Sequence, residues 1–253
     1  MGYVALALTA PRLAFGAAIL AVDPGHLIIF EPQATFRVAL DRSGSAGAPF
    51  NVPGGVYAPH IYTLAFTGTE EQILKGMYLL EEGAKKTPRV NLLGSGTILR
   101  ESMAAKELLE KDWGVAANVG SCPSFNELAR DGQDCERWNL LHPTDKPRVP
   151  FVTQQLEPHA GPVVASTDYM KNYAEQIRAF IPKGRAYKVL GTDGFGRSDF
   201  RSKLREHFEI NRHYIVVAAL KALADEGSVP AAKVAEAIKK YGINPEKINP
   251  LYA

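Results

Sequence analysis

Hydrophobic positions follow two different periods along the chain from Thr69 onward. Short, almost continuously apolar runs alternate with longer segments whose apolar residues have helical spacing. Such runs are typical of strands buried on both faces, and they lie in residues 89–96, 115–121, 161–167 and 186–192. Alternation of strands and helices at this spacing predicts parallel strands joined by crossover helices. We therefore expect an α/β fold for residues 69–253, a three-layer α/β/α sandwich with a mostly parallel sheet.

The amphipathic segments carry recognisable start and stop signals. Residues 69–83 predict a helix that Thr69 caps and Gly83 ends. Residues 97–114 predict a second helix, because their apolar side chains lie near a 3.6-residue period. We expect further helices within residues 124–143, 168–182, 200–210, 213–227 and 230–243.

The first part of the chain, residues 1–68, has a different pattern. It is apolar and rich in Gly, Ala and Pro, and it shows no convincing period. Two short strands are expected in residues 26–40 and a flexible loop in residues 41–55. The apolar segment 13–22 is shorter than the about 18–20 residues that a membrane span needs. We leave this part irregular and without a domain assignment, with disorder, translation in a wrong reading frame and a genuine extension as the explanations.

Composition and charge narrow the class of protein. The chain has 253 residues, of which 46% are hydrophobic and 22% charged, as in ordinary globular proteins. A formal charge of +2 gives no reason to expect nucleic acid or a membrane surface as a partner. Cys122 and Cys135 form no CxxC pair, and no Cys/His cluster has zinc spacing. The sequence therefore predicts no structural metal and two free thiols in a reducing compartment.

Two glycine-rich turns follow predicted strands, where ligands bind on open parallel sheets. In the first turn, Gly94 and Gly96 precede a helix whose backbone N–H groups could hold an anion. The dinucleotide fingerprint, however, needs a third glycine where this chain has Leu99. Nucleotide binding and a plain tight turn are the two interpretations of this segment.

The second turn, GTDGFGRSD at residues 191–199, has the more unusual composition. Three of its side chains, Asp193, Arg197 and Asp199, could pair among themselves, and its glycines permit backbone angles that other residues avoid. One interpretation is a strand-to-helix loop in which Ser198 or Asp199 caps a helix at Phe200. The other is an edge that docks on another domain or a ligand. The candidate residues of that edge are Asp193, Gly194, Phe195, Gly196, Arg197, Ser198 and Asp199.

Other candidates for chemistry are weaker. His142 lies beside Pro143 at the end of a predicted helix, a place more typical of a capping or surface residue than of a base. We keep it as a further candidate for the domain edge. No serine lies in a GxSxG elbow and no triad is evident, so we assign no catalytic, cofactor-binding or metal-binding residue.

Several long segments carry a family resemblance. They are VNLLGSGTILRE, LLEKDWGV, SCPSFNELARDGQDCERWNLLHP, RVPFV, ASTDYMKNYAEQIRAFIP, YKVLGTDGFGRSD and VVAALKALADEG. In this order, and without large gaps, they resemble the C-terminal domain of the homodimeric bacterial pyruvate dehydrogenases (acetyl-transferring), which have the transketolase fold. The resemblance covers about residues 69–253.

The resemblance implies a function for a larger enzyme. Members of this family decarboxylate pyruvate on thiamine diphosphate with Mg²⁺ and pass the acetyl group to lipoamide on the acyltransferase component of the complex. It also implies a cytoplasmic homodimer, in which the C-terminal domain supports dimerisation and borders the active-site entrance. The GDG…N signature of the diphosphate and metal site does not occur here, so we expect this chain alone to bind no cofactor and to be inactive. The alternatives are a stand-alone, non-catalytic α/β module that pairs with transketolase-like subunits, and a nucleotide-binding protein.

Overall fold

The computed structural model describes residues 19–23, 26–29, 50–52, 55–57 and 70–253. The chain divides into two compact units, Met1–Glu71 and Gln72–Ala253. In the described part of the first unit, strand β1 (Ile19–Asp23) pairs antiparallel with β2 (His26–Ile29), and β3 (Phe50–Val52) with β4 (Gly55–Tyr57).

These two strand pairs test part of what we expect for the first unit. Strand β2 lies in the segment 26–40 for which we predict two strands, and the remainder of that segment is outside the described residues. The predicted flexible loop 41–55 is wrong at its end, because residues 50–52 and 55 belong to the β3–β4 pair. The Gly- and Pro-rich composition predicts a loop, but hydrogen bonds between the two strands satisfy the backbone N–H and C=O groups of these residues. Our expectations of disorder or a wrong reading frame also fall outside the described residues.

A five-stranded mixed sheet forms the centre of the second unit, in the order β5-β7-β6-β8-β9. Strands β6 (Arg89–Gly94), β7 (Ala116–Ser121), β8 (Val163–Ser166) and β9 (Tyr187–Leu190) run parallel to one another. All four lie in the apolar runs that predict strands. Strand β5 (Tyr78–Glu81) pairs antiparallel with β7 at one edge. The prediction of a mostly parallel sheet is confirmed.

The predicted helix over residues 69–83 is wrong beyond Leu74, and its predicted cap, Thr69, lies outside the described residues. Helix α1 ends at Leu74 after only five residues (Glu70–Leu74), and strand β5 takes the place of the remainder. Gly76 lies between them with a φ of +98°, and a side chain there would approach the carbonyl oxygen of Ser124 to 2.5 Å. The free edge of β7 supplies backbone partners for β5, and these outweigh the local helical pattern.

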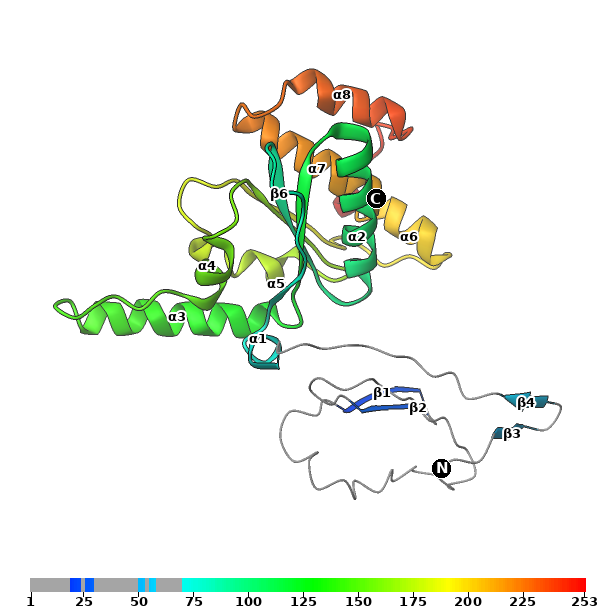
Figure 1. Cartoon of the computed structure of the whole chain (residues 1–253). Coiled ribbons are helices and arrows are strands. Elements are labelled where there is room, and N and C mark those ends of the chain that lie inside the picture. The colour runs from blue at the N-terminus through cyan, green and yellow to red at the C-terminus, as the bar shows by residue number, and fades with distance from the viewer. Residues whose placement is uncertain (1–18, 24–25, 30–49, 53–54, 58–69) are drawn as a thin grey trace. The chain divides into compact units, whose positions relative to one another are not determined.

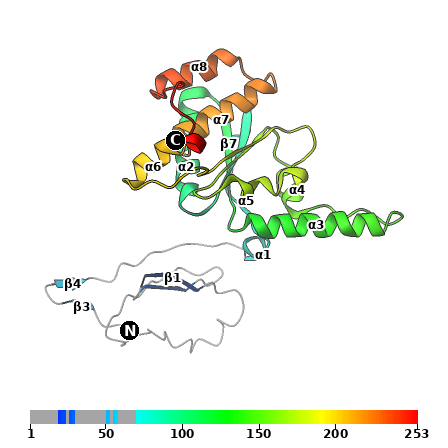
Figure 2. The same ribbon diagram turned by 180° about the vertical axis from the view of Figure 1, so that it is seen from behind.

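Helices cover both faces of the sheet, which gives three layers (Figure 1; Figure 2 shows the reverse side). On one face, α2 (Leu99–Leu108) and α7 (Arg212–Asp225) pack on Val90, Leu92 and Val164, and α8 (Ala231–Lys240) packs on α7. On the other, α3 (Phe125–Leu141), α4 (Phe151–Leu156) and α5 (Lys171–Glu175) pack on Leu93, Val163 and Ala165. Neighbouring strand residues thus feed two separate apolar cores, as expected for a sheet buried on both faces.

The remaining helical segments are short. Helix α6 (Arg201–His207) follows the last strand, and Leu109–Trp113 continue α2 as a π-helical turn. The 3₁₀ turns are Gly96–Ile98, Arg178–Phe180 and Pro250–Tyr252. Within the described ranges, no helix is long and apolar enough to cross a membrane.

One further helix prediction needs correction. Residues 168–182 form α5 and a separate 3₁₀ turn instead of one helix. The Tyr169 carbonyl accepts hydrogen bonds from the Thr192 N–H (3.0 Å) and from the Thr167 hydroxyl (2.8 Å). These contacts hold Thr167–Tyr169 as a turn, so the helix begins only at Lys171. Helix α4 is an addition that no sequence pattern predicts.

Candidate functional site

Three loops meet where the parallel strands β6, β8 and β9 end. The Ser95 N–H donates to the Ser166 carbonyl (3.2 Å), which joins the β6 loop to the end of β8. The Tyr169 hydroxyl donates to Ser95 Oγ (2.8 Å), and the Thr192 N–H donates to the Tyr169 carbonyl (3.0 Å). The loops after β6, β8 and β9 therefore form one connected surface at the edge where ligands bind on parallel sheets.

An open pocket of about 390 Å³ lies on this surface, and we call it the arginine pocket. Its polar lining comes from all three loops and from α6: Thr97, Asp168, Thr192, Arg197, Arg201 and Arg205. Leu204, Phe208 and Ile210 supply an apolar part of the wall. The volume falls in the usual range of small-molecule pockets, about 300–1,000 Å³.

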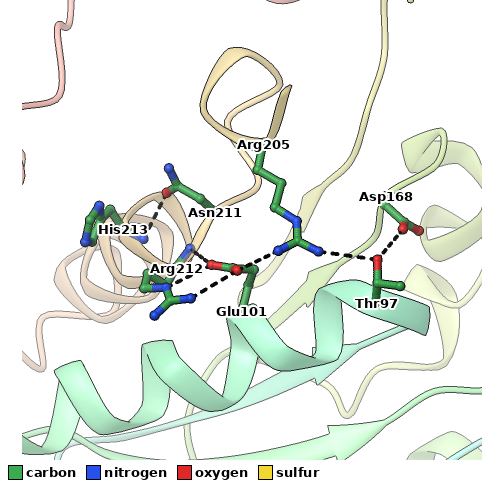
Figure 3. A network of polar contacts seen from close by, with 7 residues as sticks. All are labelled: Thr97, Glu101, Asp168, Arg205, Asn211, Arg212 and His213. Atoms are coloured by element: carbon green, nitrogen blue, oxygen red, sulfur yellow. Dashed lines mark hydrogen bonds and ion pairs between the residues drawn. The ribbon is translucent and has the colours of Figure 1, made fainter. Parts of the chain in front are cut away.

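Behind the pocket, a buried carboxylate on α2 organises the arginines (Figure 3). Glu101 is only 5% exposed, and its carboxylate accepts from Arg205 Nη1 (2.8 Å) and from Arg212 Nε (3.0 Å). The Arg212 backbone N–H donates to the same carboxylate at 3.0 Å. This network joins α2, α6 and the start of α7.

The same network continues into the pocket. Arg205 Nη2 reaches the Thr97 hydroxyl oxygen at 3.5 Å, and that hydroxyl donates to Asp168 Oδ2 at 2.7 Å. Arg205 is therefore held between Glu101 and Thr97, with its side chain only 16% exposed. Its position is fixed before any ligand enters.

The electrostatics of Glu101 follow from these contacts. Burial by itself would raise the pKa of the Glu101 carboxyl, but the hydrogen bonds and charge of Arg212, together with Arg205, outweigh burial and lower it. The hydrogen bond to Glu101 raises the pKa of Arg212 in turn. The Glu101 carboxylate and the Arg212 guanidinium are thus charged across the neutral pH range.

The predicted docking edge lies beside this pocket, and Gly194, Gly196 and Arg197 line it. Asp193, however, does not pair with Arg197. Its carboxylate accepts from the Lys171 N–H (3.1 Å) and forms an ion pair with Lys171 Nζ (3.5 Å). The loop is therefore anchored to α5 and not closed on itself. Among the described residues, no ion pair of Arg197 is found.

Of the three loop glycines, Gly194 is the one whose position most clearly requires a glycine. Its φ is +106°, and an added Cβ would collide with the carbonyl of Pro250. Gly191 lies close to the Tyr169 carbonyl, whereas nothing lies within 4 Å of a Cβ on Gly196. The prediction of special backbone angles thus holds at Gly194 and fails at Gly196.

The predicted cap of the following helix is also wrong. Helix α6 begins at Arg201 after Phe200, and no side chain caps its first turn. Asp199 accepts instead from the N–H of Phe200 at 2.6 Å, and Ser198 is exposed. Phe195 and Phe200 are 75% and 82% exposed. The loop thus presents two exposed phenylalanine rings, and the docking edge stays a prediction.

The Gly94–Gly96 turn has a packing explanation. A Cβ on Gly94 would approach the Leu99 Cα to 2.7 Å, so the glycine lets α2 lie directly against the end of β6. This favours the plain tight turn over nucleotide binding.

His142 and the two cysteines lie away from the pocket. His142 follows the last residue of α3, where its ring stacks on Trp138 (4.4 Å between centroids) and its Nδ1 lies 2.8 Å from the Trp138 carbonyl. Helix α3 and helix α6 extend to opposite sides of the sheet in both views (Figures 1 and 2). Cys122 and Cys135 are buried free thiols, as predicted, and burial raises the pKa of both.

Sequence reasoning misses three residues that line the pocket, Thr97, Asp168 and Arg205, and two that lie behind it, Glu101 and Arg212. One signal was available. Glu101 lies on the face of its helix that also carries Ile98, Ala105 and Leu109, all fully buried. A carboxylate on an apolar helix face needs a charged partner, but the partners are 104 and 111 residues away.

The family of the chain follows from comparison with known proteins. The model of the transketolase-like TK C-terminal domain matches residues 76–211, and the chain belongs to this family. Our fold prediction, a transketolase C-terminal-like α/β domain, is confirmed by this match and by the layered sheet.

Two solved transketolases overlap the chain in part. That of Campylobacter jejuni has a TM-score of 0.39 at 25% identity, over 59% of this chain and 19% of that one. That of Leishmania mexicana has a TM-score of 0.42 at 16% identity, over 67% and 22%.

Curated relatives are more similar in sequence, and they are named pyruvate dehydrogenase E1 component. The protein of Pseudomonas aeruginosa is 62% identical over 185 residues, which cover 73% of this chain and 21% of that protein. That of Cupriavidus necator is 59% identical over 186 residues, again 73% and 21%. That of Escherichia coli K12 is 55% identical over 188 residues, 74% and 21%. The chain thus spans about a fifth of the length of the curated relatives it matches, and the resemblance stated from the sequence is confirmed.

Proposed function

We propose that residues 69–253 are the C-terminal domain of a pyruvate dehydrogenase (acetyl-transferring). The observation that carries the proposal is the 62% identity over 185 residues to a protein named pyruvate dehydrogenase E1 component. The reaction of the whole enzyme would be decarboxylation of pyruvate and transfer of the acetyl group to lipoamide. Residues 1–68 stay without a domain assignment in this proposal.

One cofactor of that reaction, Mg²⁺, does not fit the described residues. No group of three or more His, Cys, Asp or Glu side chains in the described ranges is arranged to hold a metal ion. The pocket at the strand ends is lined by three arginines and one carboxylate, a donor set that suits anions and not Mg²⁺. We therefore propose that other domains of the enzyme hold Mg²⁺. We propose the same for thiamine diphosphate, because the GDG…N signature does not occur in this chain, and we derive no catalytic step here.

The role of this domain would be to hold neighbouring protein in place. The exposed rings of Phe195 and Phe200 and the anchored Asp193 support a docking edge beside the active-site entrance. The partners we propose are the second subunit of a homodimer, the remaining domains and the lipoyl acyltransferase component. We propose the cytoplasm as the compartment, since the free thiols Cys122 and Cys135 are typical of reducing conditions.

A chimera tests this proposal. Residues 72–253 would replace the corresponding region of the Pseudomonas aeruginosa protein named pyruvate dehydrogenase E1 component. We expect the chimera to form dimers and to decarboxylate pyruvate, measured by analytical ultracentrifugation and by a turnover assay. A folded chimera that neither dimerises nor turns over pyruvate would contradict the proposal.

The docking edge is tested within the same chimera by Asp193→Ala. Loss of the contacts to Lys171 should release the loop and lower dimer stability or turnover by about three- to tenfold, the effect of one or two partly exposed polar contacts. Asp199→Ala is the matched control, because within the described part of the chain Asp199 bonds only the adjacent Phe200 N–H. If Asp193→Ala leaves both dimerisation and turnover at the chimera's level, the loop has no such role.

The alternative is a stand-alone, non-catalytic module that pairs with transketolase-like subunits. The intact mass of the native protein that contains the peptide VLGTDGFGR separates the two proposals. A mass near 27.6 kDa, with co-purification of a larger thiamine enzyme, would favour the module. A mass several-fold larger would favour the enzyme domain.

A further inference from the structure

We propose that the arginine pocket binds a small molecule that carries a phosphate group. The inference goes beyond the proposed function and does not depend on it, because it rests on the charge and shape of this pocket alone. The proposed docking role of the loop does not require a pocket lined by three guanidinium groups.

The first observation is an excess of positive charge. The side chains that line the pocket include three arginines and a single carboxylate, Asp168, a difference of two positive charges. Glu101 lies behind the lining, and Arg212, which lies on its other side, balances it. The excess in the pocket therefore remains after the buried network is counted.

The second observation is which charges are already engaged. Arg205 binds Glu101, and Asp168 accepts the hydroxyl of Thr97, so these two groups are fixed in place. Arg197 and Arg201 are exposed, and no ion pair of either is found among the described residues. Two guanidinium groups thus stay available at the mouth, with a third held rigidly inside.

This arrangement selects the chemical class of the ligand. Guanidinium groups bind phosphate through paired, charge-assisted hydrogen bonds, and a phosphate dianion can use more than one of them. The hydroxyl of Thr192 offers a further donor, whereas that of Thr97 already donates to Asp168. Leu204, Phe208 and Ile210 form an apolar wall, which suits the carbon part of a phosphate monoester better than a free ion.

Glycine amides provide the readout. The full 253-residue chain has 22 glycines, and selective labelling with ¹⁵N-glycine gives one amide signal for each. Gly194 and Gly196 line the pocket, whereas Gly132 lies inside α3 and Gly242 follows α8. Titration with inorganic phosphate, and then with phenyl phosphate, should shift the first two signals saturably and leave the other two in place.

Phenyl phosphate should bind more tightly than inorganic phosphate because of the apolar wall. Sodium acetate at equal ionic strength should give weaker shifts, since it carries one charge.

Variants assign the binding to the arginines. Arg197→Gln with Arg201→Gln should weaken phosphate binding by about tenfold or more, the effect of losing charged hydrogen bonds. Both side chains are exposed, so the double variant should fold. Arg137→Gln on α3 is the matched control, an exposed arginine away from the pocket, and should keep the affinity within about twofold.

Three results would overturn the proposal. The first is chemical shifts that do not saturate with phosphate. The second is shifts of Gly132 and Gly242 as large as those of Gly194 and Gly196. The third is an equal loss of phosphate binding in Arg137→Gln and in the double variant. None of these measurements uses pyruvate turnover, so a negative result here leaves the chimera test of the proposed function independent.

Discussion

The loops at the strand ends and the outer end of α3 both place arginines beside exposed apolar side chains, but they hold them differently. At the strand ends, Glu101 reaches Arg205 and Arg212 over 104 and 111 residues of sequence. At the end of α3, Arg148 stacks on Trp138 (4.3 Å to the ring centroid) and its N–H bonds the Asn139 side chain (2.7 Å), contacts that span about ten residues. The first arrangement depends on the whole fold, while the second depends mainly on its own helix and the segment after it.

Burial makes this difference energetic. Glu101 is 5% exposed, so its partners stabilise a charge that water cannot reach. The groups around Trp138 are largely in water, where ion pairs and ring contacts contribute about 0–1 kcal/mol. Variants in the first region should therefore affect the stability of the whole domain, and variants in the second should have small, local effects.

The largest effect is expected for Glu101→Ala. It leaves two guanidinium groups without their carboxylate and should lower the free energy of unfolding by about 2 kcal/mol. This is less than the about 3–5 kcal/mol of a fully buried pair, because the side chain of Arg212 is 46% exposed. Urea denaturation would measure it, with Glu136→Ala, an exposed acid on α3, as the control. Equal loss in both variants would contradict the difference drawn here.

The pH dependence of this effect has a defined sign. Because the contacts of Glu101 lower its pKa in the folded state, its contribution is complete above the pKa of the unfolded chain. It is lost as the pH falls through the lower, folded pKa. The stability difference between the parent and Glu101→Gln should thus be constant near neutral pH and shrink below about pH 4. A difference that grows in acid would contradict the assignment.

A smaller effect is expected for Gly194→Ala. The positive φ of Gly194 and the nearby Pro250 carbonyl should make a methyl group cost about 1–3 kcal/mol. Gly196→Ala in the same loop is the matched control and should stay within about 0.5 kcal/mol, since its Cβ would meet no atom within 4 Å. Thermal or urea unfolding of the two variants would show whether the loop is fixed at Gly194 alone.

The smallest effect is expected for His142→Ala. This change removes an exposed ring that stacks on Trp138 and should reduce stability by about 0.5 kcal/mol or less. A loss above that of Gly194→Ala, measured by the same unfolding method, would mean that the outer end of α3 is coupled to the core.

The sequence predicts what depends on neighbouring residues. Four apolar runs predict the parallel strands, whose partners are their neighbours in the sheet. It fails where distant groups decide the outcome. Strand β5 is a strand only because β7 offers it an edge, and Asp193 turns to Lys171 because α5 lies there.

The same limit applies to the candidate site. The composition of residues 191–199 identifies the right loop, but the arginine pocket also needs Thr97, Asp168 and Arg205 from other segments. Nothing in the local sequence says that these residues meet. Glu101 on the apolar face of α2 indicates that a charged partner exists, but the sequence does not indicate which residue it is.

Strand β5 also has a consequence for how this protein behaves in concentrated solution. An unpaired sheet edge with apolar residues is a template on which other chains can assemble into fibrils. Here the edge position is taken by a strand of four residues whose pairing shifts register between Leu79 and Glu81. So short and irregular a border offers an incoming chain few evenly spaced backbone partners. Strand β5, which lies in a segment with a helical pattern, thus protects the domain against aggregation through this edge of its sheet.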